Sequence, residues 1–521
     1  MDLKKSSLKQ VLMKRLRDFF NSSTNHGFSH MLKSDKRLLR TIWIAFTILS
    51  TGLCAFMINE KVMNFFKYEV TTKTRIINQY KANFPTITIC NMNFFTSEFS
   101  VNFSKKFIKE KIVYNPFTIA SEYFIRSEAI NNVIHERYKD VYGDSMNKLI
   151  ADCQFELVSC NRSQIKFFYH PNYGNCYQYN SGFDGHGEKM DLKNLTMIDR
   201  VSGLRLVLNL STPDTLKLIN PNIGGVVFIH NHTTYPLMVD GVTLAPKTET
   251  NIALSRTFFQ LKEKPYSSCD KKTSDPNYLD SNAYRLVHNQ TNGYAQTLCV
   301  YQCIQNFLMD KCKCIYFMIP SFSNLNTCFN STNIECFSKY FNNYNDFLFI
   351  YEKCFEECPL ECSGMWFDKI VSFNHFSSSK YQELFENYNG TEKIYLNKNE
   401  SFDDIAIVNI YYRSLSYTQI SENPTIEIVD LFSSVGGIGG LFLGISVLTL
   451  VEFVELLLII LAEIKDYKKY IKAELFKSQK SQSRLGLLMT WTFFRTLKTN
   501  FIKRQVSLHY SASVEHCHNK D

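Results

Sequence analysis

Two long apolar segments stand out in an otherwise mixed pattern of apolar and polar positions. The first begins at Thr41 and runs for 19 residues without a charged side chain. The second begins after Asp430 and has only two charged side chains in 32 residues. Each is long enough to cross a hydrocarbon core of about 30 Å as a helix. The pattern therefore predicts two transmembrane helices, which we place at residues 41–63 and 428–462.

Residues 64–427, between the two apolar segments, mix two periodicities. Apolar runs such as PTITIC, GLRLVLNL, GGVVFIH and DDIAIVNIYY predict strands. Runs such as SEYFIRSEAINNVIHERYKD and YAQTLCVYQCIQNFLMDKC have helical spacing, as does KQVLMKRLRDFF near the N-terminus. The mixture predicts a large α+β domain between the two membrane helices.

Charge is concentrated at the two ends of the chain. The net charge is +9, and residues 1–40 and residues 463–521 each contribute +7, so the stretch between them is acidic. A nucleic-acid-binding protein would gather basic side chains on a folded face, so we expect no nucleic-acid partner. Lys and Arg beside both apolar segments predict that both termini are cytoplasmic, and the basic start argues against a cleaved signal peptide. We therefore expect a multi-pass plasma-membrane protein with residues 64–427 outside the cell.

Fourteen of the sixteen cysteines lie between Cys90 and Cys362, in the segment expected outside the cell. An even number in an oxidising compartment predicts seven disulfides. Zinc is the alternative, suggested by Cys312-Lys-Cys314 and the run CFEECPLEC, and the topology argues against it. Nine sequons in the same segment fit a glycoprotein, and they are at Asn102, Asn161, Asn194, Asn209, Asn231, Asn289, Asn330, Asn389 and Asn399.

The second apolar segment contains more than a membrane anchor needs. Five glycines fall within nine positions of it, starting at Gly436, although each glycine costs about 1 kcal/mol in a helix relative to alanine. A close helix-packing face is one explanation. However, Glu452 and Glu455 follow, and an intramembrane carboxylate normally faces water or a partner. Repeated around an axis, carboxylates and the carbonyls of a broken helix would line a cation pathway. The segment therefore indicates an oligomeric cation channel.

No motif in the chain points to catalysis. The patterns GxxxxGK[ST], GxGxxG, HExxH and GxSxG do not occur. We therefore expect neither an enzyme nor a bound cofactor or metal, and an ectoenzyme is an alternative class that lacks a catalytic motif.

Together, these features resemble the degenerin/epithelial sodium channel family, which includes acid-sensing and peptide-gated sodium channels. The resemblance runs from about residue 20 to about residue 460. It is carried by SSTNHGFSH, FPTITICN, GLRLVLNL, the ordered set of 14 cysteines and GGIGGLFLGISVLTLVE. It implies a homo- or heterotrimer in the lipid bilayer with a central, amiloride-sensitive, sodium-selective pore. It also implies that each extracellular domain has a β core surrounded by helices.

The resemblance assigns roles to particular residues. They are the selectivity filter (Gly444, Ile445 and Ser446), the gate (Ser433, Ser434, Gly436 and Gly437), an acidic ring in the pore (Glu452 and Glu455), a cytoplasmic pore motif (His26 and Gly27) and a coupling contact (Tyr68 and Tyr266). A simple turn at His26-Gly27, and two unrelated surface tyrosines, are the alternatives for the last two roles.

The resemblance also implies a disulfide pairing by family order. The expected pairs are Cys90–Cys176, Cys153–Cys160, Cys269–Cys362, Cys299–Cys358, Cys303–Cys354, Cys312–Cys336 and Cys314–Cys328.

The chain differs from acid-sensing members of the family at the positions that would sense protons. Acid-sensing members carry carboxylates where this chain has Thr233, Thr234 and the stretch FSKYFNN, and a His pair where it has Glu69 and Val70. A proton sensor needs groups that titrate at about pH 5 to 7, so proton gating is disfavoured. We expect gating by an extracellular ligand such as a neuropeptide. Proton gating, mechanical gating and constitutive opening are alternatives, and a non-conducting two-span receptor is the alternative from another class.

Overall fold

The structure is a computed structural model, and it describes residues 8–22, 36–109, 120–133, 140–291, 293–321, 325–328, 333–387, 395–396 and 402–500. The chain forms two compact units. The larger is Tyr68–Thr425, and the smaller combines Met1–Lys67 with Ile426–Asp521. The larger unit falls within residues 64–427.

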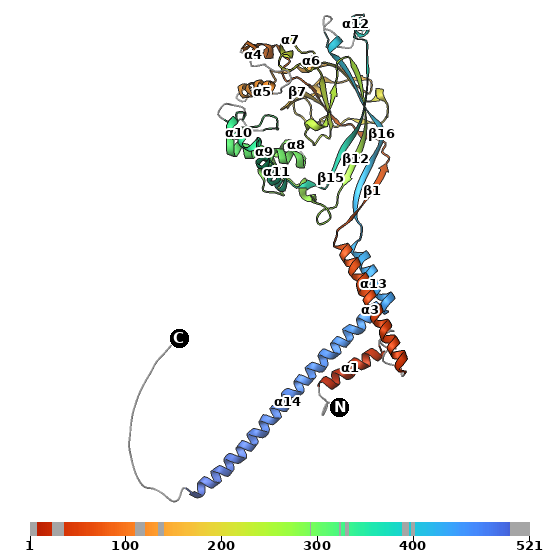
Figure 1. The fold of residues 1–521 in the computed structure, drawn as a ribbon, viewed down its shortest axis with the longest axis vertical. Helices are drawn as coiled ribbons and strands as arrows, with labels where there is room; N and C mark the ends of the chain where they lie inside the picture. The colour runs from red at the N-terminus through yellow and green to blue at the C-terminus, as the bar shows by residue number, and fades with distance from the viewer. Residues whose placement is uncertain are drawn as a thin grey trace, which may run out of the picture. The chain divides into compact units, whose positions relative to one another are not determined.

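The larger unit is built on a seven-stranded sheet (Figure 1). Its strand order is β15-β12-β16-β9-β4-β5, and β1 also pairs with β16. The strands are β15 (Ser363–His375), β12 (Thr248–Gln260), β16 (Ile405–Pro424), β9 (Leu204–Asn209), β4 (Ile150–Phe155), β5 (Val158–Ser159) and β1 (Val70–Ile77). The pair β12–β16 is parallel and the other pairs are antiparallel. Because β16 has 20 residues, its first part pairs with β9 and its last part with β1.

A second sheet has five antiparallel strands in the order β11-β10-β3-β7-β6. They are β11 (Gly241–Leu244), β10 (Gly225–His230), β3 (Thr86–Asn91), β7 (Gly174–Tyr179) and β6 (Lys166–His170). Two small pairs complete the strands, β2 (Ala82–Asn83) with β8 (Asn194–Leu195), and β13 (Cys269–Asp270) with β14 (Leu360–Glu361). The predicted strands PTITIC, GLRLVLNL, GGVVFIH and DDIAIVNIYY lie in β3, β9, β10 and β16.

Apolar side chains of both sheets share one buried core, so the sheets pack face to face. From the five-stranded sheet it includes Ile87, Ile89, Tyr177, Val227 and Ile229, and from the seven-stranded sheet Leu204, Leu206, Leu208, Ile252, Leu254, Ala406, Val408 and Ile410. This core explains why the strand runs read as nearly continuous apolar stretches.

The helices of the larger unit gather in groups beside the sheets (Figure 1). They are α4 (Glu98–Lys109), α5 (Ala120–Val133), α6 (Met146–Leu149), α7 (Asp214–Lys217), α8 (Asn282–Thr291), α9 (Gln296–Cys312), α10 (Ile334–Phe341), α11 (Tyr344–Glu357) and α12 (Ser378–Glu386). Short 3-10 helices are η1 (Arg162–Gln164), η2 (Arg200–Ser202), η3 (Met238–Asp240), η4 (Lys271–Ser274) and η5 (Phe402–Asp404). The unit is therefore an α+β domain with a β core.

Seven disulfides cross-link segments within the larger unit, and their pairing is the one that the resemblance implies. They are Cys90–Cys176, Cys153–Cys160, Cys269–Cys362, Cys299–Cys358, Cys303–Cys354, Cys312–Cys336 and Cys314–Cys328. Two of them connect α9 to the end of α11 at positions four residues apart, so successive turns of the two antiparallel helices are bridged. Of the cysteines that the structure describes, Cys54 is free and buried; Cys517 lies outside the described residues.

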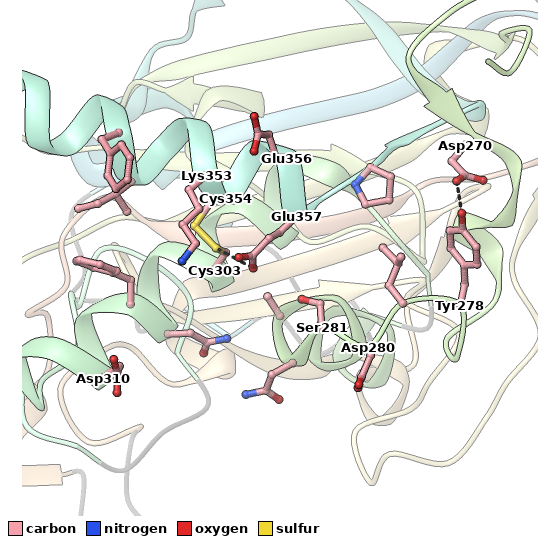
Figure 2. A pocket seen from close by; sticks show the side chains of 18 of the residues that line it. Asp270, Tyr278, Asp280, Ser281, Cys303, Asp310, Lys353, Cys354, Glu356 and Glu357 are labelled. Atoms are coloured by element: carbon pink, nitrogen blue, oxygen red, sulfur yellow. Dashed lines mark hydrogen bonds between the residues drawn. A yellow bond between two sulfur atoms is a disulfide. The ribbon is translucent and has the colours of Figure 1, made fainter. Parts of the chain in front are cut away.

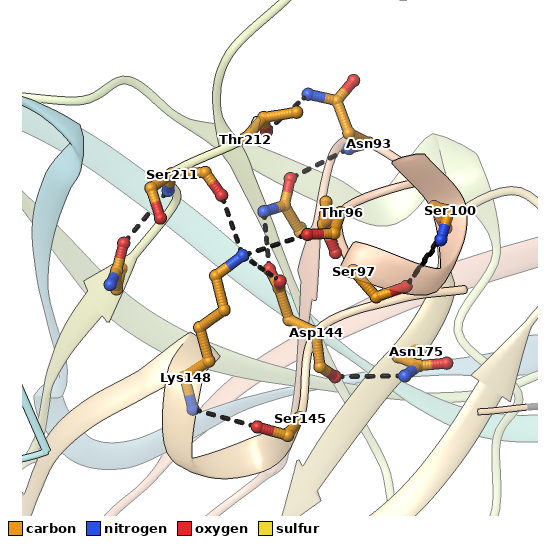
Figure 3. A network of polar contacts seen from close by, with 12 residues as sticks. Asn93, Thr96, Ser97, Ser100, Asp144, Ser145, Lys148, Asn175, Ser211 and Thr212 are labelled. Atoms are coloured by element: carbon orange, nitrogen blue, oxygen red, sulfur yellow. Dashed lines mark hydrogen bonds and ion pairs between the residues drawn. The ribbon is translucent and has the colours of Figure 1, made fainter. Parts of the chain in front are cut away.

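A buried polar network fastens the short helix α6 to neighbouring loops (Figure 3). The carboxylate of Asp144, only 1% exposed, lies 2.5 Å from Nζ of Lys148. Asn91 Nδ2 donates to the second oxygen of that carboxylate at 3.0 Å. Lys148 also donates to the carbonyls of Thr96 and Ser211, at 3.2 Å each. The network therefore satisfies an ion pair whose carboxylate has almost no access to solvent.

The smaller unit consists of α1 (Leu8–Ser22), α3 (Arg37–Phe65), α13 (Ile428–Leu443) and α14 (Val447–Asn500). Among the described residues, α3 is the one helix that is long and apolar enough to cross a membrane by itself. The helices α13 and α14 meet the same criterion only as a pair, bent by 80° at a short break. The segment expected as one helix at 428–462 is therefore two helices, and the second continues well beyond the expected end.

Candidate functional site

The break between α13 and α14 consists of Gly444, Ile445 and Ser446. Gly444 has a φ of 67°, in the left-handed region, which glycine adopts without the Cβ clash of other residues. Its N–H donates to the carbonyl of Gly440 at 3.0 Å, and the N–H of Ile445 donates to that of Gly439 at 3.2 Å. Gly444 thus ends α13 with a left-handed cap.

Ser446 begins α14 through a reciprocal pair of hydrogen bonds. Its Oγ accepts the N–H of Thr449 at 3.2 Å, and its own N–H donates to Oγ1 of Thr449 at 3.1 Å. This is the geometry of a capping box, with Thr in the place of the usual Glu or Gln. Capping on both sides of the break lowers the cost of a helix interruption in an apolar environment. The three residues expected to form the filter are therefore a well-defined interruption between two helices.

The end of α13 also contacts α3 within the smaller unit. Ser50 on α3 donates its hydroxyl to the carbonyl of Phe442 at 2.6 Å. The last carbonyls of a helix have no N–H partner within it and carry a partial negative charge. The C-terminal end of α13 therefore presents an environment that favours a cation beside the break.

The expected gate residues lie on α13 and the expected acidic residues on α14. Ser433 is exposed and Ser434 is half-buried. Apart from the adjacent residues and the nearby backbone of α13, no atom of the described residues lies within 4 Å of where a Cβ would stand on Gly436 or Gly437. The segment of α14 that follows holds Glu452 (half-buried) and Glu455 (exposed). The two are three residues apart and therefore on one helix face.

The helix α1 contacts α14, a contact that the sequence pattern did not predict. Nε and Nη2 of Arg15 donate to one carboxylate oxygen of Glu463 at 3.1 and 2.8 Å, and the rings of Phe19 and Phe453 are 5.2 Å apart. The helical spacing of the N-terminal run predicts α1 but not its neighbour. The motif His26-Gly27 lies outside the described residues.

The expected coupling residues Tyr68 and Tyr266 are in contact in the larger unit. Their rings meet edge to face, with centroids 5.5 Å apart and planes at 86°. Tyr68 has a φ of 53°, which is unusual for a bulky residue and indicates a backbone held by its surroundings. Next to it, the N–H of Thr425 donates to the carbonyl of Glu69 at 2.9 Å. The two chain segments that lead into the smaller unit are thus paired beside this aromatic contact.

A charged cavity of about 800 Å³ lies among α8, α9, α11 and the chain around Asp270 (Figure 2). Its charged lining residues are Lys264, Asp270, Asp280, Asp310, Lys311, Lys353, Glu356 and Glu357. The hydroxyl of Tyr278 donates to Asp270 at 2.6 Å, and Glu357 lies 3.8 Å from Sγ of Cys303. Both signs of charge face one cavity, which suits a charged or zwitterionic solute better than an apolar one.

Two buried histidines of the larger unit, His170 and His230, do not ionise near neutral pH. Burial lowers the pKa of His170 to about 3 and that of His230 to about 4. Burial also lowers the pKa values of His232 and His288. Glu361 is different, because its burial raises its pKa.

The positions at which acid-sensing relatives were expected to carry carboxylates have other structural roles here. The Oγ1 of Thr234 donates to the carbonyl of Asn231 at 3.0 Å, and the stretch FSKYFNN forms most of α10. Within the described part of the chain, no cluster of three or more His, Cys, Asp or Glu side chains could hold a metal ion.

Six of the nine sequons lie in the described ranges. Asn102, Asn161, Asn194 and Asn289 are exposed and Asn231 is half-buried. Asn209 is 2% exposed and lies in β9, where a glycan has no room, so the sequence overestimates the number of usable acceptors. The other three sequons lie outside the described residues.

Three features define the class of this protein as a membrane channel subunit with a large extracellular domain. They are an apolar helix, a capped interruption in a second apolar segment and a disulfide-rich β domain. The family model for the amiloride-sensitive sodium channel matches residues 19–456. The chain belongs to this family, whose members are ion channels of the plasma membrane and not enzymes.

The chain is also similar in sequence to subunits of epithelial sodium channels. The alpha subunit of the epithelial sodium channel of Pan troglodytes is 28% identical over 315 residues, which is 60% of this chain and 44% of the relative. The gamma subunit of Neoceratodus forsteri is 29% identical over 61% of this chain and 47% of the relative. The chain thus spans less than half the length of these subunits.

One relative matches along most of its length. The human bile acid-sensitive ion channel is 22% identical over 84% of this chain and 85% of its own length. Among solved structures, a proton-activated chloride channel has 6% identity over 80% of this chain and 97% of its own, and the TM-score of 0.30 is too low to indicate a shared fold.

Proposed function

We propose that this chain is a subunit of a trimeric, amiloride-sensitive, sodium-selective channel. In this proposal α3 is the first membrane span, and α13 with the start of α14 is the second. Residues 64–427 are then extracellular, and residues 1–40 and 463–521 are cytoplasmic. The observation that carries the proposal is the doubly capped break at 444–446, in a chain whose family is that of the amiloride-sensitive sodium channels.

The proposed filter combines the groups that bind small cations. Three copies of the break would place backbone carbonyls and the hydroxyl of Ser446 around one axis. Such a ring of oxygen dipoles can replace part of the hydration shell of an ion, and its width and dipole number set the selectivity. The acidic ring of Glu452 and Glu455 would then raise the local cation concentration on the cytoplasmic side. The small gate residues Ser433, Ser434, Gly436 and Gly437 would let the gate close.

Assembly into a homo- or heterotrimer has support in the larger unit. The strand β15 is at the edge of the seven-stranded sheet, and Trp366, Ile370 and Phe373 on it are exposed. An edge strand with exposed apolar side chains is a typical place for a partner subunit.

For gating, we favour an extracellular ligand such as a peptide. The charged cavity borders the loop that carries Tyr266, because Lys264 lines it. A ligand bound there could change the contact of Tyr266 with Tyr68. Proton gating is less favoured because His170 and His230 stay neutral above about pH 4, although the raised pKa of Glu361 keeps it as an alternative. Mechanical gating and constitutive opening are further alternatives.

The experiment is voltage clamp of cells that express the chain, alone and with other subunits of the family, with and without amiloride. An inward sodium current that amiloride blocks supports the proposal. If no combination yields any current although surface labelling shows the protein, the chain is a non-conducting receptor and the proposal fails.

A further inference from the structure

A second cavity of the larger unit, of about 320 Å³, differs in chemistry from the charged one. It lies where the β6–β7 turn, the segment around η3, the helix α9, the chain after α9 and the ends of α10 and α11 meet. Its lining is aromatic and aliphatic, and includes Tyr235, Tyr301, Ile304, Tyr316, Met318 and Phe341. None of the described residues that line it is Asp, Glu, Lys or Arg. The cavity therefore disfavours a charged occupant.

The one titratable imidazole in this lining is held neutral by its contacts. Nδ1 of His170 accepts the backbone N–H of Asn172 at 3.1 Å. Its Nε2 must then carry the hydrogen that is donated to the carbonyl of Pro236 at 3.2 Å, because a carbonyl can only accept. The ring also stacks on Phe228, with centroids 5.4 Å apart. Both ring nitrogens are therefore satisfied, and the turn that carries Asn172 is fixed.

One polar atom of Asn172 lacks a hydrogen-bond partner in the described part of the chain. The residue is 5% exposed, and its Nδ2 donates to the carbonyl of Met318 at 3.3 Å. This bond fixes the orientation of the amide, since the carbonyl of Met318 cannot donate. The remaining oxygen, Oδ1, is buried and has no hydrogen-bond partner among the residues that the structure describes. A buried acceptor without a donor costs about 1–3 kcal/mol, and a native structure rarely leaves one without a reason.

We propose that this cavity is a binding site for an uncharged ligand with an apolar, preferably aromatic body and one N–H or O–H donor. The donor would satisfy Oδ1 of Asn172, and the body would pack among the aromatic side chains. The volume lies at the lower end of the range for small-molecule sites, about 300–1,000 Å³. At its rim Met238 and Val239 are 48% and 85% exposed, and an apolar ligand would cover them. The proposal holds whichever stimulus opens the channel.

The test uses the purified full chain in nanodiscs and three probes with the same ring. 2-Naphthamide has an N–H donor, methyl 2-naphthoate has none, and 2-naphthoate is charged. Binding is measured by equilibrium dialysis, and empty nanodiscs give the partition into lipid. We expect saturable binding of one 2-naphthamide per chain, weaker binding of the ester and none of the carboxylate. Binding of 2-naphthamide that does not saturate above the lipid background overturns the proposal, and then Oδ1 binds only water.

Two variants at one position separate the acceptor from the rest of the cavity. Asn172→Leu keeps the branched shape of the side chain and removes the acceptor. Asn172→Asp keeps an acceptor and loses the hydrogen bond to the carbonyl of Met318. We expect Asn172→Leu to weaken 2-naphthamide about tenfold and to leave the ester unchanged. Equal weakening of both probes would overturn the role of Oδ1. Should Asn172→Leu fail to fold, Asn172→Asp decides, because the proposal requires that it retain binding of 2-naphthamide.

Discussion

Small side chains on α13 set how closely helices can approach in the proposed gate. Ser433 is exposed in the single chain, so Ser433→Phe does not disturb the subunit itself. In a closed gate on a threefold axis, three phenylalanines would overlap, at a cost of about 1–3 kcal/mol. Each 1.4 kcal/mol moves the balance toward the open state about tenfold.

We therefore expect Ser433→Phe to give a large resting current in voltage clamp at equal surface expression. Leu441→Phe is the control, because Leu441 is large and exposed already on the same helix. A resting current no greater than that of Leu441→Phe would show that residue 433 does not line the gate.

The buried His230 should make stability depend on pH. Its Nδ1 donates to the carbonyl of Asn231 and its Nε2 accepts from Thr88, at 2.8 Å each. Its pKa is about 4 in the folded chain and about 6.5 when unfolded, so between these values the unfolded chain binds more protons. Stability from this group is full above about pH 6.5 and is lost as the pH falls toward 4.

The measurement is the melting temperature of the purified chain between pH 7 and pH 4, for the wild type and for His230→Gln. We expect a smaller decrease in the variant, because glutamine cannot take up the proton. Parallel curves for the two proteins would mean that His230 contributes nothing to acid sensitivity.

The short helix α6 is held by a buried polar network (Figure 3). Lys148→Met leaves the buried carboxylate of Asp144 without its cation, while Asn91 still donates to it. We expect a loss of about 2–4 kcal/mol in unfolding free energy, measured by denaturant titration. The double variant Lys148→Met with Asp144→Asn should recover part of the loss, since it removes the uncompensated charge. If the double variant is no more stable than Lys148→Met alone, the uncompensated charge of Asp144 is not the cause of the lost stability.

The elements themselves follow from periodicity to a large extent. Four strands that contribute to the two-sheet core, β3, β9, β10 and β16, were predicted because their apolar runs are short and bounded by turn residues. The strands β7 and β12, which add Tyr177, Ile252 and Leu254 to the core, were not predicted. The resemblance placed the filter at the residues of the break in the second apolar segment, but length and apolarity alone did not place the break, because the whole segment satisfies the requirements of one span. The local signal is present in the sequence, as a glycine followed two residues later by a serine that caps with Thr449.

At the scale of the whole molecule, a substitution of a glycine on α13 can test whether the subunits assemble through this helix. Beyond the neighbouring backbone of α13, none of the described residues lies within 4 Å of a Cβ at Gly436, so Gly436→Ala should stabilise an isolated subunit slightly through helix propensity. If α13 packs closely against other subunits, the same methyl group would separate the helices. We expect less trimer on native gels or by mass photometry, and an unchanged melting temperature of the extracellular domain. An unchanged trimer fraction would show that α13 does not pack closely against another subunit at Gly436.

Some long-range contacts can be predicted from the order of residues that the family shares. Other long-range contacts have no such signal in the sequence. The disulfide pairs could be predicted because family order fixes them. The pair Tyr68 and Tyr266 could be suggested in the same way. The cavity around Asn172 could not, since segments up to about 175 residues apart in sequence contribute to it and none of them carries a binding motif. The contact of Arg15 with Glu463 was missed because both side chains belong to ordinary basic and acidic stretches.

The most direct measurement is the bi-ionic reversal potential of the amiloride-blocked current, in the wild type and in Gly444→Ala. In the variant, alanine would have to adopt the left-handed conformation that ends α13, at a cost of about 1–2 kcal/mol, so the break should change shape. We predict a clear preference for sodium over potassium in the wild type and a reduced preference in the variant at equal surface expression. A wild-type current that carries potassium as readily as sodium, or a variant with unchanged selectivity, would contradict a sodium filter at residues 444–446.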